Sequence, residues 1–242
     1  MTQKEKPTQH IRLFKGPEHA CGYLDDKIAV SVFADPSLLL NNDLYSELSR
    51  QGFRRSGEHV YRPYCQGCSA CWAYRVIVQQ FKPSKSQRRV LKQNNHFEVS
   101  LETADCYEED YELYQQYISK RHKDGDMYPP SKQQYSDFLF SDWCDTVLLR
   151  VRDKGRLIAV ICLDVLDDGL SAVYSFFDTS TDYKSLGVFV ILKSIEFCKA
   201  MNLPYCYLGY YVKGCQKMDY KVKYQPAEIF RDKRWFKLEP SK

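Results

Sequence analysis

The stretch TVLLRVRDKGRLIAVICLDVLDDGLSAVYSFF, residues 146–177, decides the fold. It contains three apolar or alternating runs, at residues 146–152, 157–165 and 170–177. Asp153-Lys154-Gly155 joins the first two runs and has the composition of a β-hairpin turn, while Asp167-Asp168-Gly169 leads into the third. The pattern predicts three consecutive strands that form an antiparallel meander.

Helical patterns lie on both sides of this meander. Two helices are predicted before it, over residues 106–122 with an Asp105 cap and over residues 132–140. After it, apolar residues at helical spacing predict a helix over residues 186–200, and Leu203-Pro204 separates that helix from a short buried strand at 205–208. A helix pair, three strands, a helix and a further strand follow the order of acyltransferases with the acetyltransferase-like fold.

The N-terminal third has a mixed pattern. Strands are predicted at residues 28–34, 75–80 and 97–101, and a short helix is predicted at residues 42–51. A break falls near residues 81–98. We therefore expect an α+β protein with a small cysteine-containing N-terminal region at 1–95, which includes a basic patch, and an acetyltransferase-like domain at 96–242. In that domain a mainly antiparallel sheet is flanked by helices.

The composition is that of a globular protein. The chain has 242 residues, a hydrophobic content of 44% and a formal net charge of +4. It contains no run of the ~20 apolar residues that a membrane span needs, and residues 1–10 are polar. We expect a cytoplasmic protein that binds no membrane. In that compartment the ten cysteines would be reduced thiols.

Three cysteines stand close together between arginines and tyrosines in the segment YRPYCQGCSACWAYR, residues 61–75, called here the cysteine block. Cys65, Cys68 and Cys71 are candidate metal ligands, and Cys21 is the only cysteine upstream that could be a fourth. Zinc, an iron–sulfur cluster and a set of free, half-buried thiols all remain open. The bacterial ferredoxin pattern continues to a cysteine followed by proline, which this chain lacks.

Cations without acids gather just after the cysteine block. Residues 81–92 contain five of them, Lys82, Lys85, Arg88, Arg89 and Lys92. On a helix, four of the five fall on one face. An acid-free basic run of this kind indicates contacts with the phosphates of a nucleic acid, and the alternative is an ordinary solvated surface.

Several motifs in a fixed order resemble the arginyltransferase family, and they resemble most its bacterial branch, the aspartate/glutamate leucyltransferases. The motifs are Cys21-Gly22-Tyr23, the cysteine block, Ser84 to Arg89, Leu170 to Asp178, Tyr207 to Tyr211 and Cys215 to Lys221. They extend over nearly the whole chain. One departure is Ala73, where the family often has proline, so backbone stiffness there is in more doubt than the charge of Arg75.

The resemblance implies an aminoacyltransferase that moves leucine from leucyl-tRNA to proteins beginning with Asp or Glu, which marks them for degradation by the N-degron route. It implies tRNA and protein partners and no DNA. Eukaryotic relatives have been linked to iron–sulfur clusters, which makes Cys21 a natural partner of the block. The alternatives are arginyl-tRNA as the donor, a non-catalytic metal-stapled module that binds RNA or acidic peptides, and an acetyltransferase that uses acetyl-CoA.

The chemistry of this reaction makes modest demands. An aminoacyl ester is already activated, and an α-amine with a pKa of ~7.7 to 8.0 is partly neutral near neutral pH. Holding the amine and the ester together lowers the barrier by ~7 to 11 kcal/mol in favourable cases. No cofactor is required, and no histidine of the chain has the spacing of a metalloprotease or a serine hydrolase.

Two sets of residues are candidates for the transfer itself. Recognition of an acidic side chain calls for a cation, and Arg62 and Arg75 are the candidates, with Tyr74 beside them; the alternative is a structural ion pair. The predicted lining of the transfer site is Tyr174, Asp178, Ser185, Tyr207 and Tyr210. Asp178 could relay the amine proton or simply stabilise a turn, and the tyrosines could be packing residues.

Overall fold

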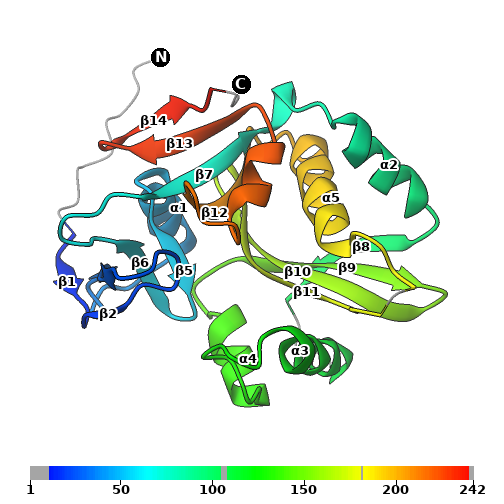
Figure 1. Ribbon diagram of the computed structural model, residues 1–242, viewed down its shortest axis with the longest axis horizontal. Helices are drawn as coiled ribbons and strands as arrows, with labels where there is room; N and C mark the ends of the chain where they lie inside the picture. Colours follow the sequence, from blue (N-terminus) through cyan, green and yellow to red (C-terminus); the bar gives the residue numbers. More distant parts are fainter. Residues whose placement is uncertain (1–10, 105–107, 181, 240–242) are drawn as a thin grey trace.

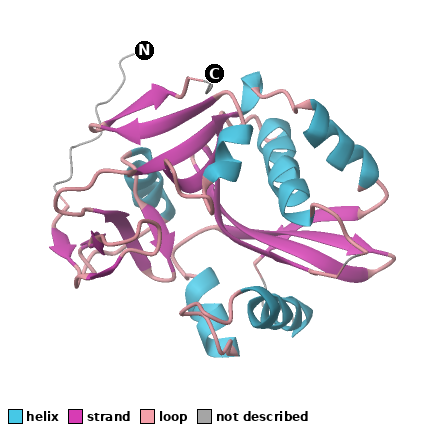
Figure 2. Cartoon of the chain, in the orientation of Figure 1, coloured by secondary structure: helices cyan, strands magenta, loops and turns pink. Residues whose placement is uncertain are grey.

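The computed structural model describes residues 11–104, 108–180 and 182–239. Its largest element is an eight-stranded sheet with the strand order β14-β13-β7-β12-β11-β10-β9-β8, in which only β11 and β12 are parallel (Figure 1). The strands are β7 (Cys71–Ile77), β8 (Glu98–Thr103), β9 (Thr146–Asp153), β10 (Arg156–Leu166), β11 (Gly169–Phe177), β12 (Tyr205–Val212), β13 (Ala227–Arg231) and β14 (Arg234–Lys237). Helices cover both faces of this sheet (Figure 2). The expected α+β class is therefore confirmed.

Strands β9, β10 and β11 form the predicted meander. Strand β10 pairs with β9 on one side and β11 on the other, so that Ile161 lies opposite both Leu149 and Ser175. Lys154 and Gly155 occupy the two turn positions between β9 and β10 with φ values of 51° and 82°. Positive φ at both central residues is what a tight type I′ hairpin needs, and the predicted hairpin is confirmed.

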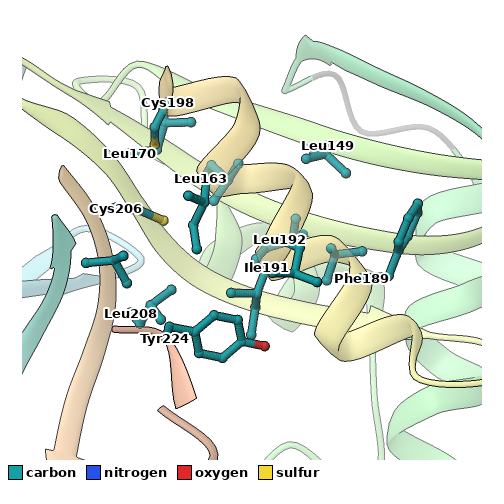
Figure 3. Close-up of a cluster of buried hydrophobic side chains, with 14 of the residues drawn as sticks. Leu149, Leu163, Leu170, Phe189, Ile191, Leu192, Cys198, Cys206, Leu208 and Tyr224 are labelled. Carbon is teal, nitrogen blue, oxygen red and sulfur yellow. The ribbon is translucent and has the colours of Figure 1, made fainter. Parts of the chain in front are cut away.

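Helix α5 (Leu186–Ala200) covers one face of the sheet. Its Phe189 and Leu192 side chains belong to a buried cluster that also contains Leu149, Leu163 and Leu208 from three strands (Figure 3). Each such side chain stabilises the fold by ~1.5–3 kcal/mol when it is fully buried. Helix α2 (Lys85–Gln93) packs against α5 as well, which explains why α5 is apolar on more than one side.

Helices α3 (Glu108–Arg121) and α4 (Lys132–Leu139) cover the opposite face, below the sheet in Figure 1. Their side chains pack against Val160 and Cys162 of β10, whereas Ile161 and Leu163 of the same strand face α5. This alternation is the period of two that a strand imposes. The predicted helices are both present, and residues 105–107, including the expected Asp105 cap, lie outside the described residues.

A second, four-stranded sheet precedes the large one. Its order is β1-β4-β6-β5, and a two-stranded hairpin of β2 and β3 lies next to it in sequence. The elements are β1 (Leu13–Lys15), β2 (His19–Ala20), β3 (Ile28–Ala29), β4 (Ser31–Ala34), α1 (Asn42–Arg50), β5 (Arg54–Ser56) and β6 (His59–Pro63). The predicted strand at 28–34 is thus divided at Val30. The Asn41 side chain caps α1 by accepting from the Leu44 amide at 2.9 Å.

Two sequence-based boundaries differ from the structure. A strand is predicted at 75–80, but β7 begins at Cys71 and ends at Ile77, and the 3₁₀ helix η1 (Val78–Gln80) follows it. Strand β12 continues four residues beyond its predicted end at 208. Strand β7 pairs with β12 and β13, so the large sheet takes a strand from the region before residue 95. Pairing between segments so far apart in sequence leaves no periodic pattern that could predict it.

The described residues also contain a second short 3₁₀ helix, η2 (Asp219–Lys223), and the β13-β14 hairpin at the sheet edge. None of the helices in this described part is long and apolar enough to cross a bilayer.

Candidate functional site

Strands β11 and β12 pair over a short distance only. Residues 169–171 pair with residues 205–207, and no further pairing occurs between the described residues of the two strands, since β12 continues along β7. We call the space between the unpaired parts, residues 172–177 and 208–212, the fork. Strands that separate leave backbone N–H and C=O groups without a ladder partner. Such groups can hold an extended ligand or the oxygen of a reacting carbonyl.

The Arg54 guanidinium lies in the fork, although Arg54 belongs to β5 of the N-terminal sheet. Its Nη2 donates to the carbonyl of Ala172 and, at 3.5 Å, to that of Val173, both on β11. On β12, a Cβ at Gly209 would overlap the guanidinium, and Gly209 has a φ of +79° that favours glycine. Arg54 therefore bridges both strands of the fork. Sequence analysis missed Arg54. The glycine at position 209 was the one indication that another group approaches the backbone of β12 closely.

Tyr207 and Tyr210, two of the predicted transfer residues, belong to β12, and their hydroxyls are engaged. Tyr207 donates to the Asp168 carboxylate at 3.0 Å, and Tyr210 donates to the Gly52 carbonyl at 2.9 Å. Burial raises the pKa of both phenols. These contacts tie β12 to its surroundings, which supports the packing alternative for both side chains.

Tyr174 is on β11 but its ring faces α3 and α4. It contacts the rings of Phe138, Tyr114 and Tyr117 at centroid distances of 5.4, 6.3 and 6.4 Å. Burial raises the pKa of this phenol as well. The structure therefore places Tyr174 on the face of the sheet that α3 and α4 cover.

Asp178 and Ser185 lie at the end of β11 and the start of α5. The Asp178 carboxylate accepts from Arg156 Nη2 at 2.6 Å and from the Ser180 amide at 2.8 Å, which is a turn-stabilising arrangement. Ser185 is exposed, has a φ of +59° and makes no side-chain capping bond to α5. The five predicted transfer residues thus lie in three places and not in one cluster. Their catalytic roles stay predictions.

Arg75, predicted to bind an acidic substrate, is buried among internal partners. Its Nη2 lies 2.7 Å from Glu228 Oε2, its Nη1 lies 3.8 Å from Asp168 Oδ2, and its guanidinium stacks on Trp235 at 3.9 Å. These contacts favour the structural ion pair. Tyr74 is fully buried and donates to the Tyr224 carbonyl at 3.0 Å, so it offers no surface to a substrate.

Arg62 is more open. Its guanidinium stacks on Phe53 at 4.8 Å and Nη1 donates to the Gln51 carbonyl at 3.5 Å, and no carboxylate of the described residues forms an ion pair with it. It lines a hollow of about 320 Å³ together with the three cysteines of the block and Tyr210. The predicted substrate role of Arg62 is compatible with this position.

The four candidate metal ligands share a second hollow of about 200 Å³, lined by Cys21, Cys65, Cys68 and Cys71. Burial, with the neighbouring thiols, raises the pKa of Cys71 to about 12. Cys65 Sγ contacts the Val30 amide and carbonyl at 3.4 and 3.6 Å. Over the described ranges, no three His, Cys, Asp or Glu side chains are placed to hold one metal ion. Metal binding by these thiols therefore stays a prediction.

The basic run forms the exposed face of α2. Ser84 and Gln87 make a capping box at its start, and Gln87 is buried on the side opposite the cations. All five cations, Lys82, Lys85, Arg88, Arg89 and Lys92, are exposed, and none forms an ion pair with a carboxylate among the described residues. A helix that carries an uncompensated basic stripe is suited to phosphates.

Gln87 and Asn94 connect α2 to the segments that flank the fork. Gln87 Nε2 donates to the carbonyl of Lys223, the last residue of η2, at 3.0 Å. Asn94 Nδ2 donates to the Lys184 carbonyl at 3.3 Å, just before α5. A ligand bound along α2 would therefore lie next to these segments.

The fold is α+β, and comparisons with known proteins define the class of enzyme. Family models described as the N terminus and the C terminus of arginine-tRNA-protein transferase match residues 19–89 and 109–231. Proteins named aspartate/glutamate leucyltransferase are similar over nearly the whole chain. That of Alcanivorax borkumensis is 50% identical over 93% of this chain and 93% of its own, and that of Pseudomonas aeruginosa is 44% identical over 94% and 97%.

The chain therefore belongs to the arginine-tRNA-protein transferase family, and it is an aminoacyltransferase. The predicted resemblance is confirmed. Among solved structures, the C-terminal domain of a lysylphosphatidylglycerol synthetase from Agrobacterium fabrum is similar with a TM-score of 0.49 and 12% identity, over 80% of this chain and 62% of that one.

Proposed function

We propose that the protein transfers leucine from leucyl-tRNA to the α-amine of proteins that begin with Asp or Glu, and so marks them for degradation by the N-degron route in the cytoplasm. The observation that carries the proposal is the similarity to the named leucyltransferases, which extends over 92–96% of the chain. It includes both the fork and the N-terminal sheet that reaches into it.

Aminoacyl transfer forms one bond, breaks another and moves protons. The neutral α-amine attacks the ester carbonyl of the leucyl group, the C–N bond forms, and the ester C–O bond breaks. The amine loses a proton, and the released ribose oxygen takes one up. Because the ester is already activated, positioning and stabilisation of the tetrahedral oxyanion supply the rate enhancement. In the fork, backbone N–H groups without a ladder partner are suited to the oxyanion, and the separated strands are suited to positioning.

The tRNA would bind along α2. Its exposed cations can neutralise phosphates, and the hydrogen bonds of Gln87 and Asn94 hold α2 against Lys223 and Lys184 beside the fork. A tRNA that follows this helix can place its aminoacyl end near the start of α5. Phosphate contacts of this kind set position and carry no sequence information.

We propose further that transfer requires no bound metal. Aminoacyl transfer is neither a redox reaction nor dependent on a Lewis acid, and in the described residues no three His, Cys, Asp or Glu side chains are placed around one point. Cys65 would then hold the block against Val30 as a structural contact. Unchanged transfer after anaerobic purification and chelation is expected; loss of transfer together with stoichiometric iron or zinc would overturn this part of the proposal.

The transfer assay offers leucyl-tRNA and arginyl-tRNA in turn with peptides that begin with Asp, Glu, Lys or Arg. Leucine transfer to the Asp and Glu peptides is expected. Preference for arginyl-tRNA would make arginine the donated residue, and transfer to Lys or Arg peptides alone would overturn the substrate class. Binding of tRNA and peptide without any transfer would identify a non-catalytic module.

A further inference from the structure

Two cations, Arg54 and Lys221, lie together at the fork, and within the described ranges neither forms an ion pair. Lys221 of η2 is 3% exposed, and its Nζ donates to the Tyr210 carbonyl on β12. The Arg54 guanidinium repels the Lys221 ammonium, and the thiols of Cys215 and Cys71 are further neighbours. No carboxylate of the described residues forms an ion pair with Lys221. Burial and Arg54 lower the pKa of Lys221 to about 7, as expected for a buried ammonium without a counter-ion.

Other buried arginines of the described chain are neutralised. Arg55 pairs with Asp164, Arg75 with Glu228 and Arg150 with Asp110, at 2.5 to 2.7 Å. Arg54 and Lys221 differ, because no carboxylate of the described residues forms an ion pair with either of them. An uncompensated buried charge is costly. Two adjacent ones make the site favourable for an anion that arrives with a ligand.

We propose that Arg54 and Lys221 bind the side-chain carboxylate of the first residue of the protein substrate. The inference rests on the proposed function and names the subsite that selects Asp and Glu. The guanidinium already contacts β11 and lies against Gly209 of β12. The α-amine of the same residue, only a few bonds from its carboxylate, would then lie in the fork where the ester is attacked.

A carboxylate suits this place better than a backbone phosphate. A phosphodiester carries a sugar on each side and needs an open surface. The exposed cations of α2 lie on such a surface. A short acidic side chain can reach a cation as deep as Lys221. Tyr23 and Tyr220, which are both exposed at the surface, are neighbours of Arg54, since its guanidinium acts to lower the pKa of each phenol.

The two arginines of the cysteine block are less suited. Arg75 already holds Glu228 and Asp168. Arg62 lies closer to solvent, where an ion pair contributes little to affinity. Arg54 is half-buried, and its planar guanidinium holds its N–H donors in a fixed geometry that matches a carboxylate. A second cation, Lys221, lies next to it. Both features favour tight recognition of a carboxylate.

The test compares peptides that begin with Asp and with Asn, which differ in charge and hardly in shape. For the wild type, the ratio of kcat/KM for the Asp peptide to that for the Asn peptide is expected to be large. In Arg54→Gln and in Lys221→Met this ratio should fall by about 10- to 100-fold, the range of a hydrogen bond to a charged group. The KM for leucyl-tRNA should not change. Arg234→Gln, an exposed arginine on β14, is the matched control.

Because the ratio compares two peptides on the same folded enzyme, partial unfolding does not alter it. Should Arg54→Gln fail to fold, Lys221→Met and the charge-conserving Arg54→Lys carry the test. An unchanged ratio in the variants, a fall confined to Arg62→Gln, or weaker tRNA binding at an unchanged ratio would each overturn the inference. A wild type that does not transfer leucine to the Asp peptide would contradict the proposed function itself.

Discussion

The Arg55 guanidinium meets the Asp164 carboxylate at 3.0 Å from Nε to Oδ2 and at 2.5 Å from Nη2 to Oδ1, and both side chains are wholly buried. Arg55 belongs to β5 and Asp164 to β10, so this ion pair joins the N-terminal sheet to the large sheet. Arg54 precedes Arg55 on the same strand and points to the other side. The ion pair thereby fixes the strand that delivers Arg54 to the fork.

Replacing Asp164 should destabilise the whole protein. In Asp164→Asn the Arg55 charge stays buried without its counter-ion, and the free energy of unfolding should fall by about 3–5 kcal/mol. Denaturant unfolding measures it. Asp167→Asn is the control, because Asp167 is 40% exposed and lies 3.6 Å from Arg50, so its loss should change stability by under ~1 kcal/mol. Similar effects of both variants would contradict the structural role of the pair.

Replacement of Arg75 should lower the free energy of unfolding more than replacement of Arg62. In Arg75→Ala the Glu228 and Asp168 carboxylates lose their buried partner, and unfolding free energy should drop by ~3 kcal/mol or more. Arg62→Ala should cost about 1 kcal/mol, because the lost contact is a half-exposed stacking on Phe53. Thermal unfolding of the two variants side by side tests this. A stable Arg75→Ala enzyme that has lost its selectivity for acidic peptides would restore the substrate role of Arg75.

Asp178→Asn separates proton transfer from turn formation. Asp178 is bound by Arg156 and by the Ser180 amide, so we expect kcat within a few-fold of the wild type and a stability loss of ~1 kcal/mol. Single-turnover transfer with bound leucyl-tRNA measures the step directly. A large loss of transfer with unchanged tRNA binding would instead establish Asp178 as a proton relay.

Salt dependence should identify the tRNA surface. If Arg88 and Arg89 each neutralise one phosphate, their double replacement by alanine should reduce the slope of log affinity against log salt by ~1.4 to 1.8. The matched control is replacement of the exposed Lys154 and Lys199, which lie outside α2. Equal slopes for both double variants would exclude α2 as the binding surface.

The buried thiol of Cys162 should make stability fall at alkaline pH. Burial and the neighbouring Asp164 raise its pKa in the folded state, whereas an unfolded cysteine titrates at ~8.5. The folded state therefore keeps a proton that the unfolded chain releases, and stability is fully present below pH ~8.5 and lost above it by up to ~1.4 kcal/mol per pH unit. Between pH 8.5 and 10, Cys162→Ala should show a shallower decline than the wild type.

Val160→Ala is the control for that measurement, since Val160 faces the same side of β10 and does not titrate. It should lower stability by a similar amount at every pH. A Cys162→Ala variant with the same pH slope as the wild type would show that this thiol does not contribute.

Local patterns predicted the elements that depend on near neighbours. The turn residues Lys154 and Gly155, the apolar face of α5 and the acid-free run on α2 each determine their own structure, because hairpins, amphipathic helices and basic stripes are defined within a few residues. The family motifs predicted the enzyme class. The roles of the predicted transfer residues stay predictions, since tyrosines and aspartates of strands and turns look alike in the sequence whether they pack or react.

The sequence by itself therefore determined the α+β class, the order of the main elements and the family. Only the tertiary structure decided that Arg75 is neutralised by Glu228 and that β7 enters the large sheet. It also decided that Arg54 and Lys221 meet at the fork, with no ion-pair partner in the part of the chain that the structure describes. Such pairings join residues more than a hundred positions apart. They are fixed by how two sheets and a turn pack together, and no local pattern of side chains encodes that packing.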